Sequence, residues 1–388
     1  MPSIENFYYI LHQRLLTPLN IIDIMYWKFG SVSHSDLWYG RYLSYHNTYG
    51  CILQKIPVCY FFDQEPINEK SVYDCEVTHW VRNFKLLANS EKSDLKQQIL
   101  KENQYQDWYY FFHGFAALDW YRDSQYFDQD IEWTKIYVSL NRLHTNDRSY
   151  RLNLVARLAK QKLLDQGHVS LHLGHTEYGT WQQELANANT CLSSEACELI
   201  AEHLDQPLHL DRGNTTGSLS ADFGHQEFEL WKSGFWHIVT ETVFYHDKLH
   251  LTEKIFKPIV AQRPFMLAAA PGNLAYLKSY GFQTFDQWID ESYDSIQDPD
   301  QRLQAIVDQT QRLCAMSDAE LREMHREMRP VLEHNFNHMW SGFKHQIVNE
   351  LVDNFETCVR LWNNGRVDDL ELPLHNIDLA QVKQVLLR

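Results

Sequence analysis

The sequence predicts an α/β fold with two domains, and three observations support this. Short apolar runs typical of strands alternate with amphipathic segments typical of helices, and this order occurs twice along the chain. The chain has 388 residues, more than the roughly 100–200 of one ordinary domain. Hydrophobic residues make up 44% and charged residues 22% of it, which provides a core and excludes a mostly disordered protein.

The first half contains two predicted strands with a polar segment between them. Residues 56–62 form an apolar run, which the polar residues 63–66 end with a proline. Residues 86–103 have a helical composition, and a second apolar run, 108–112, ends at His113. Ligands of open α/β sheets bind beyond the carboxyl ends of the strands, so polar residues at these ends are candidates for a site.

The second half begins with a predicted strand at 135–140, a polar turn at 141–146 and a helix at 151–164. Further strands are predicted at 169–173, 235–241 and 264–270, and further helices at 251–260, 273–280, 302–313, from 317 onward and at 340–362. The alternation predicts two Rossmann-like domains facing each other across a cleft. We expect these domains at 1–134 and 135–340, followed by a helical segment at 341–388 that packs back on the first domain.

Charge and cysteine content narrow the class of protein. With 35 Lys and Arg against 51 Asp and Glu, the net charge is −16, which argues against binding to nucleic acid or anionic membranes through basic surface. Seven cysteines without a CxxC pair argue against a disulfide framework and a zinc ribbon. Without a signal peptide or a long apolar stretch, we expect a cytoplasmic protein with reduced thiols.

The segment with the densest chemical signal starts at Thr252. Thr252 is a good N-cap, which places Glu253 and Lys254 in the first turn of the predicted helix. Backbone N–H groups and the helix dipole favour an anion there, and the lysine adds a positive charge. The alternative is an ordinary helix start with a solvated Glu–Lys pair.

Three stretches of the second half together carry a family resemblance. Thr252-Glu253-Lys254 precedes an apolar helix, Arg263-Pro264-Phe265-Met266-Leu267 follows it, and Gly281-Phe282-Gln283-Thr284-Phe285 comes next. This pattern resembles the donor-binding domain of GT-B glycosyltransferases, in style that of the α-1,3-fucosyltransferase-like group, and it spans roughly residues 135–285. The resemblance implies a GT-B fold and transfer of a sugar from a nucleotide sugar.

The resemblance also implies roles for two adjacent residues. In that group a Ser/Thr-Glu-Lys motif binds the nucleotide sugar, so Glu253 would contact the ribose and Lys254 the diphosphate, next to Thr252. An acidic residue before the motif would be Glu241. This chain departs from the pattern at Thr242, where the group has Asn, and at the Arg-Pro-Phe strand, so neither the sugar nor the base follows from it.

A second phosphate contact is implied upstream. In the family, a strand is followed by Asn, a polar loop and Arg, and here the strand ends at Asn141. Arg151 matches best, and Arg142 and Arg148 are alternatives. Cations placed where negative charge develops on a leaving diphosphate stabilise the transition state, so this chemistry requires no metal.

An inverting enzyme also needs a general base for the acceptor hydroxyl. Glu65 is the first candidate, Asp63 the second and His113 the third, because each follows a predicted strand of the first half. The alternative for the two acids is a turn with surface carboxylates, and for the histidine a structural position.

Three patterns resemble metal ligands, and we expect none of them to bind a metal. Residues 128–130 and 298–300 have the Asp-x-Asp spacing, which is common in an acidic chain. His334 and His338 lie four residues apart on a predicted helix, without a third ligand.

The sequence therefore predicts an inverting, metal-independent GT-B glycosyltransferase that uses a nucleoside-diphosphate sugar and a hydroxyl acceptor, with no further cofactor. Two alternatives remain open. One is a glycosyltransferase that acts on DNA bases, which the negative charge disfavours. The other is a non-catalytic sugar- or nucleotide-binding module on the same scaffold.

Overall fold

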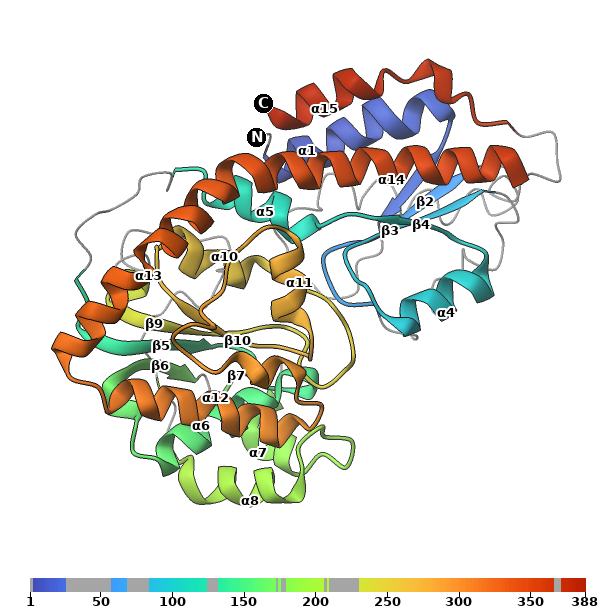
Figure 1. Ribbon diagram of the computed structural model, residues 1–388. Coiled ribbons are helices and arrows are strands. Elements are labelled where there is room, and N and C mark those ends of the chain that lie inside the picture. The colour runs from blue at the N-terminus through green and yellow to red at the C-terminus, as the bar shows by residue number, and fades with distance from the viewer. Residues whose placement is uncertain are drawn as a thin grey trace. The chain divides into compact units, whose positions relative to one another are not determined.

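The chain folds into two compact α/β units, each built on a parallel sheet (Figure 1). The computed structural model describes residues 3–25, 57–67, 84–123, 132–171, 174–175, 179–205, 208, 230–365 and 371–388. The first unit is formed by Met1–Arg122 together with Ser341–Arg388, and the second by the chain between Asp123 and Trp340. The α/β class with parallel sheets is confirmed.

The first unit has a four-stranded parallel sheet in the order β1-β2-β3-β4. Its strands are β1 (Ile22–Met25), β2 (Val58–Phe62), β3 (Lys85–Asn89) and β4 (Gln106–Tyr109). Its α-helices are α1 (Ile4–Leu11), α4 (Asp94–Asn103), α5 (Phe112–Trp120), α14 (Lys344–Gly365) and α15 (Leu379–Leu387). Parallel register, such as Tyr60 beside Leu87, places all four carboxyl ends at one edge.

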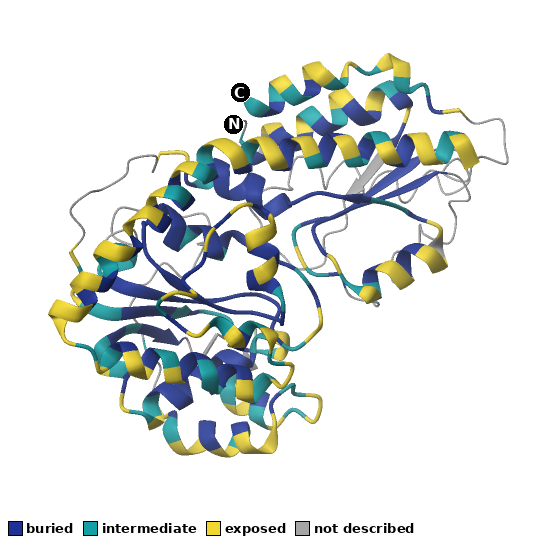
Figure 2. Cartoon of the chain, in the orientation of Figure 1, coloured by how far each residue is buried: buried dark blue, intermediate teal, exposed yellow. Residues whose placement is uncertain are grey.

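Both faces of the first sheet are covered, which explains why the central strand β2 reads as an apolar run. Val58, Tyr60 and Phe62 belong to a core cluster with Ile99 and Leu100 of α4. On the other face the C-terminal helix α14 lies against β4, where the Trp108 indole N–H donates to the Leu351 carbonyl at 3.0 Å. Figure 2 shows β2 and β3 buried and the outer helix faces exposed. Residues 341–388 thus belong to the first unit.

The second unit has a four-stranded parallel sheet in the order β10-β9-β5-β6. Its strands are β5 (Lys135–Asn141), β6 (Gly167–Leu171), β9 (Gly234–Thr240) and β10 (Phe265–Ala268), with a separate hairpin of β7 (Gly174–His175) and β8 (Gly179–Thr180). Its α-helices are α6 (Tyr150–Lys160), α7 (Trp181–Leu185), α8 (Ser194–His203), α10 (Glu253–Val260), α11 (Asn273–Ser279), α12 (Pro299–Cys314) and α13 (Asp318–His338). Figure 1 shows α6 and α12 on one face of this sheet and α10 and α13 on the other.

Two local predictions for the first half need correction. The segment predicted as one helix, 86–103, is the strand β3 followed by the helix α4, which begins at its own N-cap, Ser93. The run predicted as a strand up to residue 112 ends earlier, because β4 stops at Tyr109 and α5 starts at Phe112. His113 therefore lies in the first turn of a helix and not at a strand end.

The described residues of the three metal-like patterns form hydrogen bonds with other groups of the protein. Asp298 caps α12 by accepting from the Gln301 N–H at 2.8 Å, and Asp300 accepts from the Asn153 amide at 2.6 Å. His334 and His338 stack at 5.5 Å and contact the carbonyls of Gly281 and Tyr280 through their Nε2 atoms. Residues 128–130 lie outside the described residues. Among the residues that are described, no group of three His, Cys, Asp or Glu could hold a metal ion.

Candidate functional site

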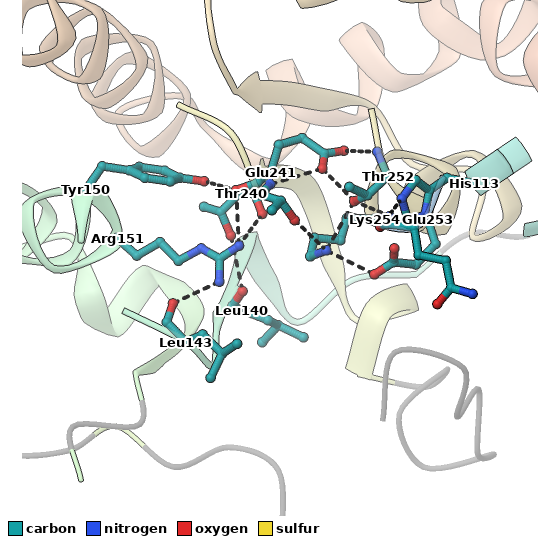
Figure 3. Close-up of polar contacts among 12 residues, drawn as sticks. His113, Leu140, Leu143, Tyr150, Arg151, Thr240, Glu241, Thr252, Glu253 and Lys254 are labelled. Carbon is teal, nitrogen blue, oxygen red and sulfur yellow. Dashed lines mark hydrogen bonds and ion pairs between the residues drawn. The ribbon is translucent and has the colours of Figure 1, made fainter. Parts of the chain in front are cut away.

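The candidate site of the second unit lies where α10 begins, beyond the carboxyl end of β9 (Figure 3). Thr252 has extended backbone and caps α10, its hydroxyl accepting from the Lys254 N–H at 3.4 Å. This confirms the predicted N-cap. The first turn contains Glu253, which is buried, and Lys254, whose side chain is 29% exposed.

The ammonium group of Lys254 contacts two oxygens at the start of α10 and one just after β9. It donates to Glu253 Oε1 at 3.0 Å, to Thr252 Oγ1 at 3.1 Å and to Thr242 Oγ1 at 3.4 Å. The contact with Thr242 is the longest, so it is the one that an incoming anion would replace most easily. The lysine is partly exposed and held at the helix start, where an anion is favoured.

The carboxylate of Glu241 is fully buried beneath this helix start. Oε1 accepts from the Thr252 N–H at 3.2 Å, while Oε2 accepts from the Thr252 hydroxyl at 2.5 Å and from the Thr242 N–H at 3.3 Å. The sequence predicted a residue that contacts the donor. In the structure Glu241 contacts the protein backbone and the cap, and direct contact with a ligand stays a prediction.

Arg151 lies in the first turn of α6 and is 3% exposed. Nη1 donates to the Leu143 carbonyl at 2.8 Å, and Nη2 donates to the carbonyls of Thr240 and Glu241 at 2.9 and 3.1 Å. The guanidinium thus ties the loop after β5 to the end of β9. A phosphate contact by Arg151 stays a prediction, and the structure adds a role that the sequence did not suggest.

Asn141 is the last residue of β5, and Arg142 follows it at the same edge of the sheet. Asn141 is buried, and its side-chain amide donates to Ser139 and to the Ser170 carbonyl, which fixes the neighbouring ends of β5 and β6. Arg142 and Arg148 are half-buried and follow the strand in the loop and the short 3₁₀ turn Asn146–Arg148. Both are more accessible than Arg151.

The loop between β9 and α10 is tied down along its length. Ala270 N–H donates to the Val243 carbonyl at 3.0 Å, and the Arg302 Nη2 donates to the Phe244 carbonyl at 2.6 Å. The Asn273 amide donates to the Lys248 carbonyl at 2.9 Å, and the Tyr150 ring stacks on Phe244 at 4.1 Å. A loop held in this way presents its groups in one arrangement before a ligand arrives, which lowers the entropy cost of binding.

The candidate bases of the first unit lie around the carboxyl end of β2. Asp63 is buried, and its Oδ2 accepts from the Tyr8 hydroxyl at 2.9 Å and from the Tyr110 hydroxyl. Burial raises the pKa of Asp63 to about 6, although the two hydroxyl hydrogen bonds act in the opposite direction. Burial and the Asp63 charge raise the pKa of both tyrosines, so they remain protonated donors.

Glu65 and His113 differ in accessibility. Glu65 is exposed beyond the strand, whereas His113 is buried and its Nε2 contacts the Gln64 carbonyl at 3.0 Å. Sequence reasoning missed Tyr8 and Tyr110, which hold Asp63 from α1 and from the residue after β4. A tyrosine at the end of an apolar strand, such as Tyr110, was the signal that could have indicated a polar partner there.

Comparison of the chain with models of protein families, with curated proteins and with solved structures gives no match. The site is therefore argued from its own residues. Among the described residues, no helix is both long and apolar enough to cross a membrane.

Proposed function

We propose that this chain is an inverting, metal-independent glycosyltransferase that moves a sugar from a nucleoside-diphosphate sugar to a hydroxyl acceptor. In this proposal the two units are the two domains of a GT-B enzyme, with the donor bound by the second unit. The observation that carries it is the α10 start, where capped backbone N–H groups and the partly exposed Lys254 meet at the carboxyl edge of a parallel sheet.

The donor diphosphate would bind at this helix start. As the bond to the sugar breaks, negative charge grows on the leaving diphosphate, and the charge of Lys254 and the dipole of α10 stabilise it. Lys254 would exchange its 3.4 Å contact with Thr242 for a phosphate oxygen. Glu253, one residue before, would accept hydrogen bonds from the ribose hydroxyls.

A second positive charge would come from the loop after β5. Because Arg151 donates to three backbone carbonyls, the proposal gives the second phosphate contact to Arg142 or Arg148, whose side chains are half-buried. Arg151 then serves to hold the two strand ends together. Arginine suits such a contact, because its planar fork binds phosphate oxygens in pairs.

The acceptor hydroxyl would lose its proton to an acid of the first unit. Glu65 is the exposed candidate, and Asp63 is the candidate whose pKa of about 6 lies near neutral pH. A non-catalytic nucleotide-binding module is the second candidate function. It is favoured by the burial of Asp63 and His113, whose polar groups contact Tyr8, Tyr110 and the Gln64 carbonyl within the unit.

The donor site is tested by nucleotide binding without metal. Wild-type protein is titrated with the diphosphates of guanosine, uridine, cytidine, adenosine and thymidine, and its melting temperature is recorded, because a ligand of the folded state raises it. We expect a shift with one nucleotide that Lys254→Ala abolishes. Lys257→Ala, a half-buried lysine at the other end of α10, is the matched control and keeps the shift.

Two results would contradict the donor site: no shift with any nucleotide, or a shift that Lys254→Ala leaves unchanged. Nucleotide binding alone does not distinguish an enzyme from a non-catalytic module. Hydrolysis and transfer are therefore measured with the nucleotide sugar of the same base. Turnover that falls in Glu65→Gln or Asp63→Asn supports the enzyme, and binding without turnover supports the module.

A further inference from the structure

We propose that Glu241 is a positioning residue, which acts through the hydroxyl of Thr252 to set the place of the Lys254 ammonium group. This inference rests on the proposed function and deepens it. It assigns to a fully buried carboxylate a part in phosphate recognition that involves no contact with the ligand.

The Thr252 hydroxyl has one proton to donate. The Thr252 hydroxyl donates to Glu241 Oε2 at 2.5 Å, and the oxygens of this carboxyl group also accept from the backbone N–H groups of Thr242 and Thr252. The proton of Thr252 therefore points to Glu241. Both lone pairs of Oγ1 remain for other donors, and these are the Lys254 backbone N–H at 3.4 Å and the Lys254 ammonium at 3.1 Å.

Glu241 itself is held in one position by hydrogen bonds of its side chain and of its backbone. Its two oxygens accept from the N–H groups of Thr242 and Thr252, which lie on the two sides of the loop between β9 and α10. Its own backbone N–H donates to the Ala268 carbonyl at 3.0 Å, and its carbonyl accepts from the Tyr150 hydroxyl at 2.6 Å. Figure 3 shows the chain of contacts from Glu241 through Thr252 to Lys254.

This arrangement restricts the position of the Lys254 ammonium group. Lys254 has a flexible four-carbon stem, and ordering it on binding a phosphate would cost entropy. The oriented Thr252 oxygen, with Glu253 Oε1 at 3.0 Å, holds the ammonium beside the helix start in the absence of a ligand. Glu241 thus contributes to affinity for phosphate groups and not to affinity for a nucleoside.

The variant Glu241→Gln tests whether the Thr252 hydroxyl donates to residue 241. An amide has one oxygen and one NH₂ group, whereas both carboxylate oxygens accept here. With the NH₂ at the Oε2 position the Thr252 hydroxyl loses its acceptor, and with the NH₂ at the Oε1 position the Thr252 backbone N–H loses its acceptor, so either orientation disturbs the Thr252 cap. Thr252→Val removes the hydroxyl at nearly constant volume, and Thr252→Ser retains it.

The experiment compares a nucleoside diphosphate with its nucleoside by isothermal titration calorimetry. We expect Glu241→Gln and Thr252→Val to weaken the diphosphate about 10-fold, with nucleoside affinity unchanged, and Thr252→Ser to stay within about 2-fold of wild type. In a Lys254→Ala background, Glu241→Gln should have no further effect on the diphosphate. A parallel loss for both ligands, or full additivity with Lys254→Ala, would overturn the inference.

A ligand-free readout separates this inference from the proposed function. If wild-type protein binds no nucleotide, the donor site fails, yet the position of the lysine is still measurable by mass spectrometry after brief acetic anhydride treatment. We expect Lys254 to react several-fold faster in Glu241→Gln, while Lys257 reacts at the wild-type rate. An unchanged rate for Lys254 would overturn the positioning role by itself.

Discussion

The carboxyl edges of the two sheets bury polar groups of opposite kinds. In the first unit a carboxylate, Asp63, is surrounded by neutral hydroxyls and its pKa is raised to about 6. In the second unit Lys254 forms an ion pair with Glu253. Arg151 donates to a carbonyl in the loop after β5 and to one at the end of β9. The first edge thus holds a carboxyl group with a raised pKa, and the second holds an ion pair and a buried arginine.

The largest effect is expected from removing the arginine of the second edge. Arg151→Ala removes the guanidinium donor to the carbonyls of Leu143 and Thr240 and leaves the Glu241 carbonyl with the Tyr150 hydroxyl, which costs about 4 kcal/mol of unfolding free energy. Urea denaturation followed by circular dichroism measures it. Arg142→Ala, a half-buried arginine of the same loop, is the control, and equal small losses in both variants would remove the distinction between them.

The next effect concerns the acid of the first edge. The pKa of Asp63 is raised from 3.8 to about 6 in the folded protein, so the folded state binds the proton more tightly than the unfolded state. Stability is therefore highest below about pH 4 for this group and falls as the pH rises to about 6, by roughly 3 kcal/mol.

Asp63→Asn should remove that component of the pH dependence. The free energy of unfolding is measured for both proteins between pH 3 and pH 7, and the difference between them should change by about 3 kcal/mol over this range. Parallel pH profiles would show that Asp63 titrates alike in the folded and unfolded chain, and the contrast between the edges would be lost.

A smaller effect is expected at the α10 cap. Thr252→Ala removes the oxygen that accepts from the Lys254 N–H and the donor to Glu241, which costs about 1–2 kcal/mol. Ser317→Ala, which removes the N-cap of α13 in the same unit, is the control. It differs from Thr252→Ala in that its cap is exposed. Thermal denaturation should show the larger loss at Thr252, since its partner Glu241 is buried.

The sequence predicted the strands and the helix start of the second unit well, and the reason is their burial. β5, β9 and β10 are covered on both faces, so they read as apolar runs, and Thr252 signals its cap locally. The strand β3 was hidden because Lys85–Asn89 has no β-branched residue and is followed by a good helix.

The partners of the buried polar groups could not be predicted. Arg151 contacts the carbonyls of residues 89 and 90 positions away, and backbone carbonyls leave no trace in a sequence. Asp63 contacts tyrosines 55 and 47 positions away, one in the helix α1 and the other just after the strand β4. Such pairs follow from the topology of the sheet and not from a local pattern.

The first unit is assembled from both ends of the chain, and this has a consequence for its biosynthesis. Its sheet leaves the ribosome early, but α14, which accepts the Trp108 hydrogen bond and lies against β4, leaves more than 200 residues later. The second unit, whose last residue is Trp340, is complete before that helix appears. During translation the face of β4 that α14 later covers is therefore exposed to solvent. A nascent chain paused before residue 341 should bind chaperones at this face.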